Sequence, residues 1–151
     1  NFLVEAAGKK FLVDCGMYQG KDTEELQNSE DFLYNVNEID FMLLTHAHID
    51  HSGRIPKLYN DGFRGKIYCT HATKDLCSIM LPDSGHIQES EIEWRNRKRI
   101  RAGEDPLPPL YTAEDAIRCM EVFWSVGYDE IVDVAENIQV RFNDAGHMLR
   151  I

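Results

Sequence analysis

The chain has 151 residues, 43% of them hydrophobic and 28% charged, with a formal net charge of −10 at pH 7. This length can enclose one hydrophobic core, so a single soluble globular domain is expected. No apolar run approaches the roughly 18 to 20 residues that span a bilayer, which excludes a transmembrane helix from the sequence. The four cysteines are scattered without a C-x-x-C pair. This pattern indicates neither a zinc ribbon nor a disulfide framework and best fits a reducing, cytoplasmic compartment.

The N-terminal segment predicts a β-hairpin. Residues 2–6 and 11–13 are mainly apolar and flank a turn at Gly8. The sequence opens at Asn1 without a methionine, beside this first strand, so we expect the natural N-terminus to lie upstream. Between residues 16 and 39 the apolar spacing weakens and acidic residues accumulate, which predicts a loop with a short helix.

Side chains that commonly bind metals follow the apolar run 41–44, which predicts a buried strand. Residues 45–53 read Thr-His-Ala-His-Ile-Asp-His-Ser-Gly. In extended backbone, side chains two apart point the same way, so His46 and His48 can converge on one ion, with neutral nitrogens at about 2.0 to 2.1 Å from zinc. Asp50 and His51 follow where the chain bends, and they would face a second ion beside the first. A lone histidine is usually an ordinary polar residue, but this spacing after a buried strand favours a metal site.

The middle of the chain alternates between helices and strands. Ser52 can cap a helix that Gly62 ends, and residues 66–69 predict a short strand. Thr70 can cap a helix over residues 72–81. This alternation predicts an α/β fold.

A basic run lies in the predicted helix 86–102, which Gly103 ends. Five of seven consecutive residues are cationic, namely Arg95, Arg97, Lys98, Arg99 and Arg101. Such a run would attract a nucleic-acid backbone independently of its sequence. Glu91 and Glu93 stand four positions before Arg95 and Arg97, so a solvated face of ion pairs is an equal alternative. The net negative charge does not favour nucleic acid, although only the surface near the site matters.

The C-terminal part predicts a helix followed by two paired strands. Thr112 and the acidic residues after it start a helix that extends to about residue 125. Val122, Phe123 and Val126 are expected in the core. Residues 130–134 and 138–142 alternate in polarity as paired strands, and the second leads to His147.

Three motifs resemble those of one family. Residues 45–53 resemble the signature of the metallo-β-lactamase fold, a superfamily of mostly dinuclear zinc hydrolases. Residues 143–149, which include Ala-Gly-His, resemble the third metal motif of its RNA-processing branch, the β-CASP nucleases. The resemblance implies that His147 completes the first zinc site with His46 and His48. Residues 11–16 resemble the motif in which an aspartate, here Asp14, braces the metal loop from behind the ligands.

Two further stretches narrow the branch. Residues 83–89 and 109–116 resemble segments of bacterial β-CASP relatives and are not part of the general superfamily signature. They disfavour the alternative that the metal motif alone would allow. That alternative is a glyoxalase-like or lactone-cleaving enzyme of the superfamily, acting on a small ester, thioester or lactone. His86 could approach a substrate phosphate, but a structural role is favoured. His71 has no ligand partner at metal spacing and is expected to be hydrogen-bonded or exposed.

The resemblance implies an αββα sandwich of which residues 1–151 form about the first half. A domain truncated at both ends is therefore expected, with a β-CASP cap domain downstream. The aspartate that bridges the two metals and the last histidine ligand would also lie downstream. Residues 149–151 depart from the family, which has small residues there. The chain alone is accordingly expected to hold at most one ion firmly and to lack nuclease activity.

The function that the resemblance implies is metal-dependent hydrolysis of RNA phosphodiesters. Two ions would hold the scissile phosphate, lower the pKa of a shared water and stabilise the leaving oxygen. Asp50 would ligate the second ion and accept a proton. Zinc is the expected metal, although manganese or iron could occupy the same groups. RNA is the expected partner, and the sequence leaves open whether the protein forms a homo-oligomer. The alternative to a hydrolase is a non-catalytic scaffold protein.

Overall fold

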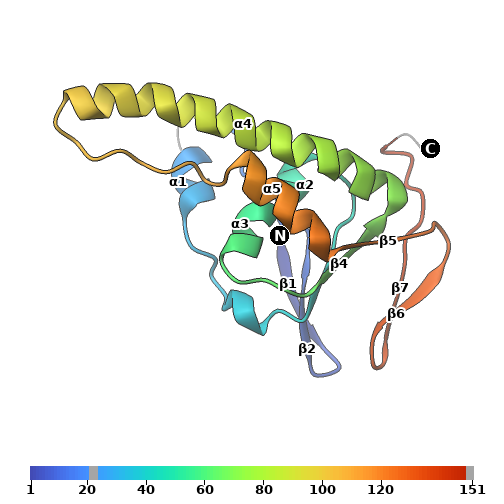
Figure 1. Cartoon of the computed structure of the whole chain (residues 1–151). Helices are drawn as coiled ribbons and strands as arrows, with labels where there is room; N and C mark the ends of the chain where they lie inside the picture. Colours follow the sequence, from blue (N-terminus) through green and yellow to red (C-terminus); the bar gives the residue numbers. More distant parts are fainter. Residues whose placement is uncertain (21–23, 149–151) are drawn as a thin grey trace.

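The computed structural model describes residues 1–20 and 24–148. Its centre is a five-stranded sheet in the order β1-β2-β3-β4-β5 (Figure 1). β1 (Phe2–Ala6) and β2 (Lys9–Val13) pair antiparallel. β3 (Phe41–Leu43), β4 (Lys66–Thr70) and β5 (Phe123–Val126) continue the sheet in parallel. The carboxyl ends of β2, β3, β4 and β5 therefore meet at one edge of the sheet.

The predicted hairpin at the N-terminus is confirmed. Ala6 pairs with Lys9, and the two residues between them, Ala7 and Gly8, have φ of 48° and 72°. Two positive φ angles in a two-residue loop are typical of a type I′ turn, whose twist matches that of the flanking strands. The turn thus sets the register in which β2 enters the sheet.

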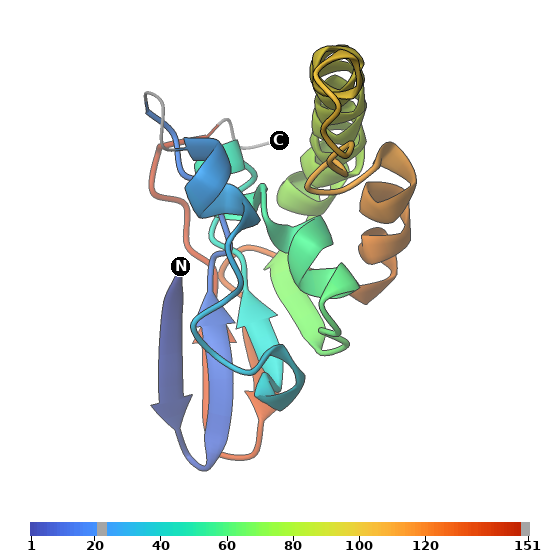
Figure 2. The same ribbon diagram turned by 90° about the vertical axis from the view of Figure 1, so that its left-hand side faces the viewer.

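Layers cover the sheet on both sides. One side packs against α3 (Ile55–Asn60), α4 (His71–Arg101) and α5 (Ala113–Cys119), which Figure 2 shows together on one side of the strands. The other side packs against the hairpin β6 (Ile131–Ala135) and β7 (Ile138–Arg141). This helix–sheet–hairpin arrangement confirms the predicted α/β class and the paired C-terminal strands.

The helices predicted over residues 72–81 and 86–102 form one continuous helix, α4, of 31 residues. Pro82 lies inside it, although proline lacks the N–H of an interior helix position. Packing outweighs this local penalty, because Leu81 is fully buried and Gly85 allows close approach to α5. A Cβ on Gly85 would lie 2.6 Å from the backbone nitrogen of Ala113.

The helix predicted from residue 112 to 125 is too long. Thr112 caps α5 in a capping box with Asp115, but α5 ends at Cys119 and a 3₁₀ turn, η2 (Met120–Val122), follows. The next residues form β5, in which Phe123 lies opposite Ile67 of β4. Aromatic and β-branched residues suit a strand, and the edge of β4 supplies hydrogen-bond partners that the local sequence does not reveal.

The helix predicted from Ser52 to Gly62 is divided in two. A short α2 (Ile49–Ser52) precedes α3, and Ser52 lies in its last turn instead of capping a helix. The Ser52 hydroxyl donates to the backbone oxygens of Ala47 at 2.8 Å and His48 at 3.1 Å. Gly62, with φ of 114°, follows the end of α3 as predicted.

Two short helical segments lie between β2 and β3, where a loop and a short helix were predicted. They are α1 (Glu24–Ser29) and η1 (Val36–Glu38). No helix in the described part of the chain combines the length and the apolar content needed to cross a bilayer.

Candidate metal centre

The loop after β3 alternates between buried anchors and projecting polar side chains. Leu44 and Ala47 are fully buried, and the Leu44 N–H donates to the Tyr68 oxygen of β4. Thr45 and His48 are exposed, and His46 is half-buried. The buried positions hold the backbone in place, so the imidazoles begin from a preorganised loop.

Three histidines converge above this loop. The His46 Nε2 lies 3.0 Å from the His48 Nδ1, and the His147 Nε2 lies 3.2 Å from the same atom. The ligand atoms of all three lie within 4.8 Å of one another. Nitrogens bound at about 2.0 to 2.1 Å to one tetrahedral zinc stand roughly 3.4 Å apart, so this all-imidazole donor set fits such an ion.

The tautomers follow from the hydrogen bonds behind the cluster. The Thr45 hydroxyl donates to the Asp14 carboxylate at 2.9 Å, so its oxygen accepts from His46 Nδ1–H, which is 2.9 Å away. A proton on Nδ1 leaves the Nε2 lone pair of His46 directed toward His48. Burial, and then the repulsion of the His51, His48 and His147 charges, lowers the pKa of His46. The neutral ring that metal binding requires is therefore favoured.

Asp14 is the buried centre of this network. Its carboxylate accepts from the Thr45 backbone N–H at 2.8 Å and from His51 Nδ1–H at 2.7 Å. In the neutral tautomer that this bond implies, the Nε2 of His51 carries the lone pair, 3.6 Å from the Asp50 carboxylate. The His51 ring is centred 4.1 Å from that of His46. A second nitrogen–oxygen pair thus stands directly beside the three histidines.

Sequence reasoning missed Thr45 and Gly16, both of which position the loop. Thr45 links Asp14 to His46, and its hydroxyl immediately before the first histidine was the available signal. Gly16 lies against α2, so close that a Cβ there would be 1.6 Å from the Asp50 backbone oxygen. The residues on either side of Gly16 donate to α2, Cys15 N to His51 O at 2.8 Å and Met17 N to Ile49 O at 3.0 Å.

The remaining histidines do not join the cluster. His71 is exposed at the first residue of α4, and His86 is exposed further along the same helix. The His86 ring lies 3.5 Å from the Glu89 carboxylate. The exposed position of His71 agrees with the expectation from the sequence, whereas the structural role favoured for His86 stays a prediction.

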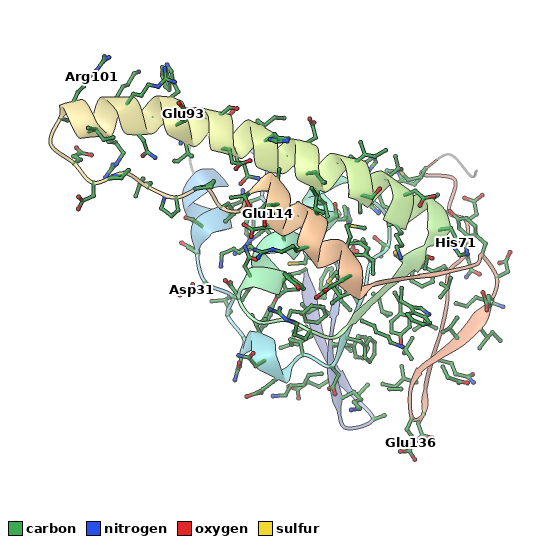
Figure 3. All side chains as sticks on the ribbon, in the orientation of Figure 1. Asp31, His71, Glu93, Arg101, Glu114 and Glu136 are labelled. Atoms are coloured by element: carbon green, nitrogen blue, oxygen red, sulfur yellow. The ribbon has the colours of Figure 1, made fainter. Side chains whose placement is uncertain are left out.

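The basic run lies toward the far end of α4. Figure 3 shows His71 at one end of this helix and Arg101 at the other. The Cys77 thiol contacts Ser52 of α2, and at 1.5 Å per residue the run begins about 27 Å further along the axis. Glu93 pairs with Arg97 at 2.7 Å, in agreement with the ion-pair alternative, and Glu104 pairs with Arg99 at 2.8 Å. The structure therefore does not bring these cations to the histidines.

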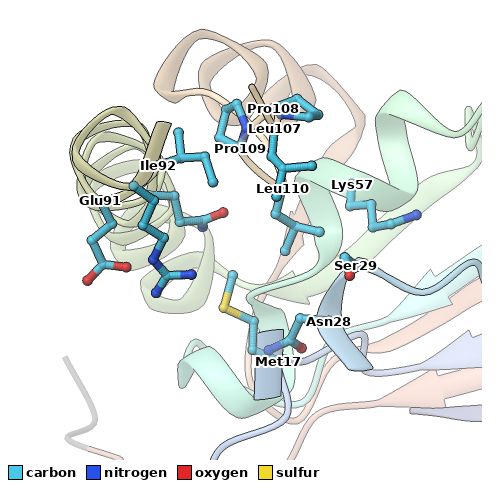
Figure 4. Close-up of a pocket in the computed structure, with 12 residues that line it drawn as sticks. Met17, Asn28, Ser29, Lys57, Glu91, Ile92, Leu107, Pro108, Pro109 and Leu110 are labelled. Atoms are coloured by element: carbon cyan, nitrogen blue, oxygen red, sulfur yellow. The ribbon is translucent and has the colours of Figure 1, made fainter. Parts of the chain in front are cut away.

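An apolar cavity lies between α4 and the segment that returns to α5. It has a volume of about 460 Å³. Figure 4 shows Leu107, Pro109 and Leu110 facing Ile92 of α4, with Met17 at the other side of the cavity. The Met17 N–H also donates a hydrogen bond to Ile49 of α2, so this cavity borders the segment that holds the metal loop in place.

Replacing Asp14 by asparagine should weaken zinc binding by about 10- to 100-fold, because the side chain that orients Thr45 and His51 loses its charge. Asparagine tolerates the left-handed backbone at this position, where φ is 60°, so the fold should persist. Calorimetric zinc titration measures the change. Asp40→Asn is the matched control, since Asp40 accepts from the Lys10 N–H at 2.9 Å next to the opposite end of β3. Equal zinc affinity in both variants would contradict the role of Asp14.

Comparison with known proteins places the chain in a family. Residues 1–116 match the family described as the metallo-beta-lactamase superfamily. The chain belongs to this superfamily. Its members are divalent-metal proteins, typically of zinc, which agrees with the histidine cluster described above.

Similar proteins come from bacteria, archaea and animals. Ribonuclease TTHA0252 of Thermus thermophilus is 34% identical over 146 residues, which cover 97% of this chain and 29% of that protein. Transcription termination factor FttA of Methanosarcina mazei is 29% identical, with coverages of 98% and 21%. Integrator complex subunit 11 of Gallus gallus is 30% identical, with coverages of 97% and 23%. These relatives confirm the predicted β-CASP branch of the superfamily, and the chain spans less than a third of the length of each.

Proposed function

We propose that this chain supplies the metal centre of a zinc-dependent hydrolase that cleaves RNA phosphodiester bonds. The observation that carries the proposal is the convergence of His46, His48 and His147, the last from 99 residues beyond His48. The similarity to a protein named as a ribonuclease supports RNA as the substrate. A small ester, thioester or lactone is the competing substrate class within the superfamily.

The residues of the site divide into two ligand groups in this proposal. His46, His48 and His147 hold the first ion, and Asp50 with His51 contributes to the second. When bound, such ions supply electrostatic stabilisation to phosphate oxygens and lower the pKa of water. Asp14 and Thr45 keep the histidine tautomers that present lone pairs to the site. In this proposal the Asp50 carboxylate, half-exposed beside the cluster, would accept a proton from water.

In the full-length protein, the metal ions would have two further ligands, a bridging aspartate and a last histidine. Both would come from sequence beyond this chain, together with a β-CASP cap domain. A cytoplasmic location is supported by the four cysteines, which are buried and free of disulfides.

Basic residues at the far end of α4, distant from the metal site, would attract the RNA backbone. The group consists of Arg95, Arg97, Lys98, Arg99 and Arg101. Ion pairs already engage Arg97 and Arg99, so their pull on phosphate is reduced. The logarithm of the RNA binding constant should therefore fall with the logarithm of the salt concentration, and the slope should be modest.

Full-length protein purified without chelator is expected to cleave end-labelled single-stranded RNA when zinc or manganese is present. Chelator should abolish cleavage, because the charge stabilisation at the phosphate is lost. Gel electrophoresis of the products measures the rate. Intact RNA under both metals, with cleavage of a small ester or thioester by the same preparation, would refute the ribonuclease and support the competing substrate class.

A further inference from the structure

One face of α4 near its C-terminal end combines an exposed aromatic ring with cations. Trp94, Arg97, Lys98 and Arg101 stand at positions i, i+3, i+4 and i+7, which share a helix face. The Trp94 side chain is 58% exposed, so it contributes little to the core. A large exposed ring on a charged surface is not explained by packing.

Trp94 lies between a cation and a hollow. The Lys98 Nζ lies 3.6 Å from the ring centroid, one helical turn toward the C-terminus. Toward the N-terminus, a hollow of about 360 Å³ is lined by Ser90, Glu91, Trp94 and Arg95. The indole therefore forms one wall of an open space while a lysine covers part of its surface.

The hollow and the cations beside it suit different parts of a nucleotide. Glu91 and Arg95 both line the hollow, so its wall has no excess of positive charge for a phosphate, and the Glu91 carboxylate can accept N–H groups of a nucleobase. In the described part of the chain, neither Lys98 nor Arg101 takes part in an ion pair, whereas Arg97 and Arg99 do. The hollow thus suits a base, and the two cations suit the phosphates beside it.

We propose that Trp94 is a stacking platform for one unpaired base of single-stranded RNA, with Lys98 and Arg101 against the flanking phosphates. The proposal takes its substrate class from the proposed function, but it concerns binding and not cleavage. Bases stack on aromatic rings whatever their identity, and cations beside the ring add sequence-independent attraction. The platform would hold RNA at a distance from the histidine cluster.

Other ligands fit this face less well. Double-stranded RNA keeps its bases stacked inside the duplex, where a tryptophan exposed on one face of α4 cannot reach them. Protein interfaces are depleted in lysine and glutamate, whereas Lys98 covers part of this ring and Glu91 lines the hollow beside it. Single-stranded RNA satisfies both the ring and the charges.

Trp124 provides a matched control within the chain. Its side chain is 52% exposed, and the Lys66 Nζ lies 4.0 Å from its ring centroid. It belongs to β5, which contains no basic residue. The two tryptophans therefore share exposure and a lysine neighbour but differ in the cationic face.

The test uses the full-length protein in chelator, so that no cleavage occurs. Fluorescence anisotropy measures its affinity for labelled single-stranded oligoadenylate and for an abasic ribose-phosphate oligomer of equal length. Trp94→Ala should weaken oligoadenylate binding roughly 5- to 150-fold and leave the abasic oligomer unaffected. Trp94→Phe should retain most of the affinity, and Trp124→Ala should change neither oligomer. Lys98→Ala should weaken both, because its contact is to the backbone.

Three outcomes would overturn the platform. Unchanged oligoadenylate affinity in Trp94→Ala is the first, and an equal loss on both oligomers is the second. The third is unchanged RNA affinity with loss of self-association in sedimentation, which would assign the face to protein contacts. Failure of the proposed function is distinguishable, because a protein that cleaves no RNA with added metal can still show binding that depends on Trp94. Circular dichroism confirms that each variant is folded.

Discussion

Replacing His46, His48 or His147 by alanine is expected to abolish tight zinc binding by this chain and RNA cleavage by the full-length protein. Each variant leaves two nitrogens where three converge within 4.8 Å. Loss of a residue that merely orients a ligand reduces metal affinity or activity by 10- to 100-fold, so loss of a ligand should exceed about 100-fold. Calorimetric titration and metal analysis measure the first effect, and labelled RNA measures the second.

The chain contains its own controls for this experiment. His71→Ala and His86→Ala remove the same side chain from exposed positions on α4, away from the cluster. Both should bind zinc as tightly as the unchanged chain. If one cluster variant keeps full affinity, or if His71→Ala loses as much as His46→Ala, the three-histidine site is wrong.

The stoichiometry of the 151-residue chain follows from the same ligand count. One ion per chain should bind firmly, because three imidazoles converge at one point. Asp50 and His51 offer only two further ligand atoms, 3.6 Å apart, so a second ion should bind weakly. Two tight sites in the titration would show that the second group is more complete than these residues indicate.

Gly16→Ala should be the most damaging substitution outside the ligands. A Cβ at this position would lie 1.6 Å from the Asp50 oxygen and 2.5 Å from the His51 nitrogen, both backbone atoms. Either α2 or the end of β2 must move, which should cost about 3 kcal/mol or more of folding free energy. Thermal unfolding should show a midpoint lower by roughly 6 to 12 °C. Zinc affinity should fall by about 10-fold or more, since α2 follows His48 directly and Asp14, beyond the end of β2, orients Thr45.

Gly127→Ala is the matched control for this substitution. Gly127, like Gly16, does not have a positive φ, and the nearest atom to its added Cβ would be the flexible Glu130 carboxylate at 3.1 Å. That side chain can move, so the change should stay within about 0.5 kcal/mol. Equal melting temperatures for the two variants would rule out close backbone contact as the reason for a glycine at position 16.

Local patterns in the sequence were sufficient for several parts of this molecule. The turn at Gly8, the buried strand before the histidines and the cap at Thr112 depend on residues that are neighbours in the chain. The spacing of His46 and His48 likewise predicts a shared direction, because side-chain direction in extended backbone depends only on position along the strand. The place of His147 beside them came from a resemblance, since no local pattern relates residues 99 positions apart.

Contacts between distant segments decided the rest. Pro82 and Gly85 suggest a break, yet α4 continues because packing against α5 outweighs the local penalty. Residues 123–126 become a strand because the open edge of β4 satisfies their backbone groups. The role of Gly16 and the contact between Thr45 and Asp14 appear only when β2 and the metal loop lie side by side. The sequence by itself determined which side chains could serve a metal site, whereas the tertiary structure determined their tautomers and neighbours, because those depend on distances between segments that only folding brings together.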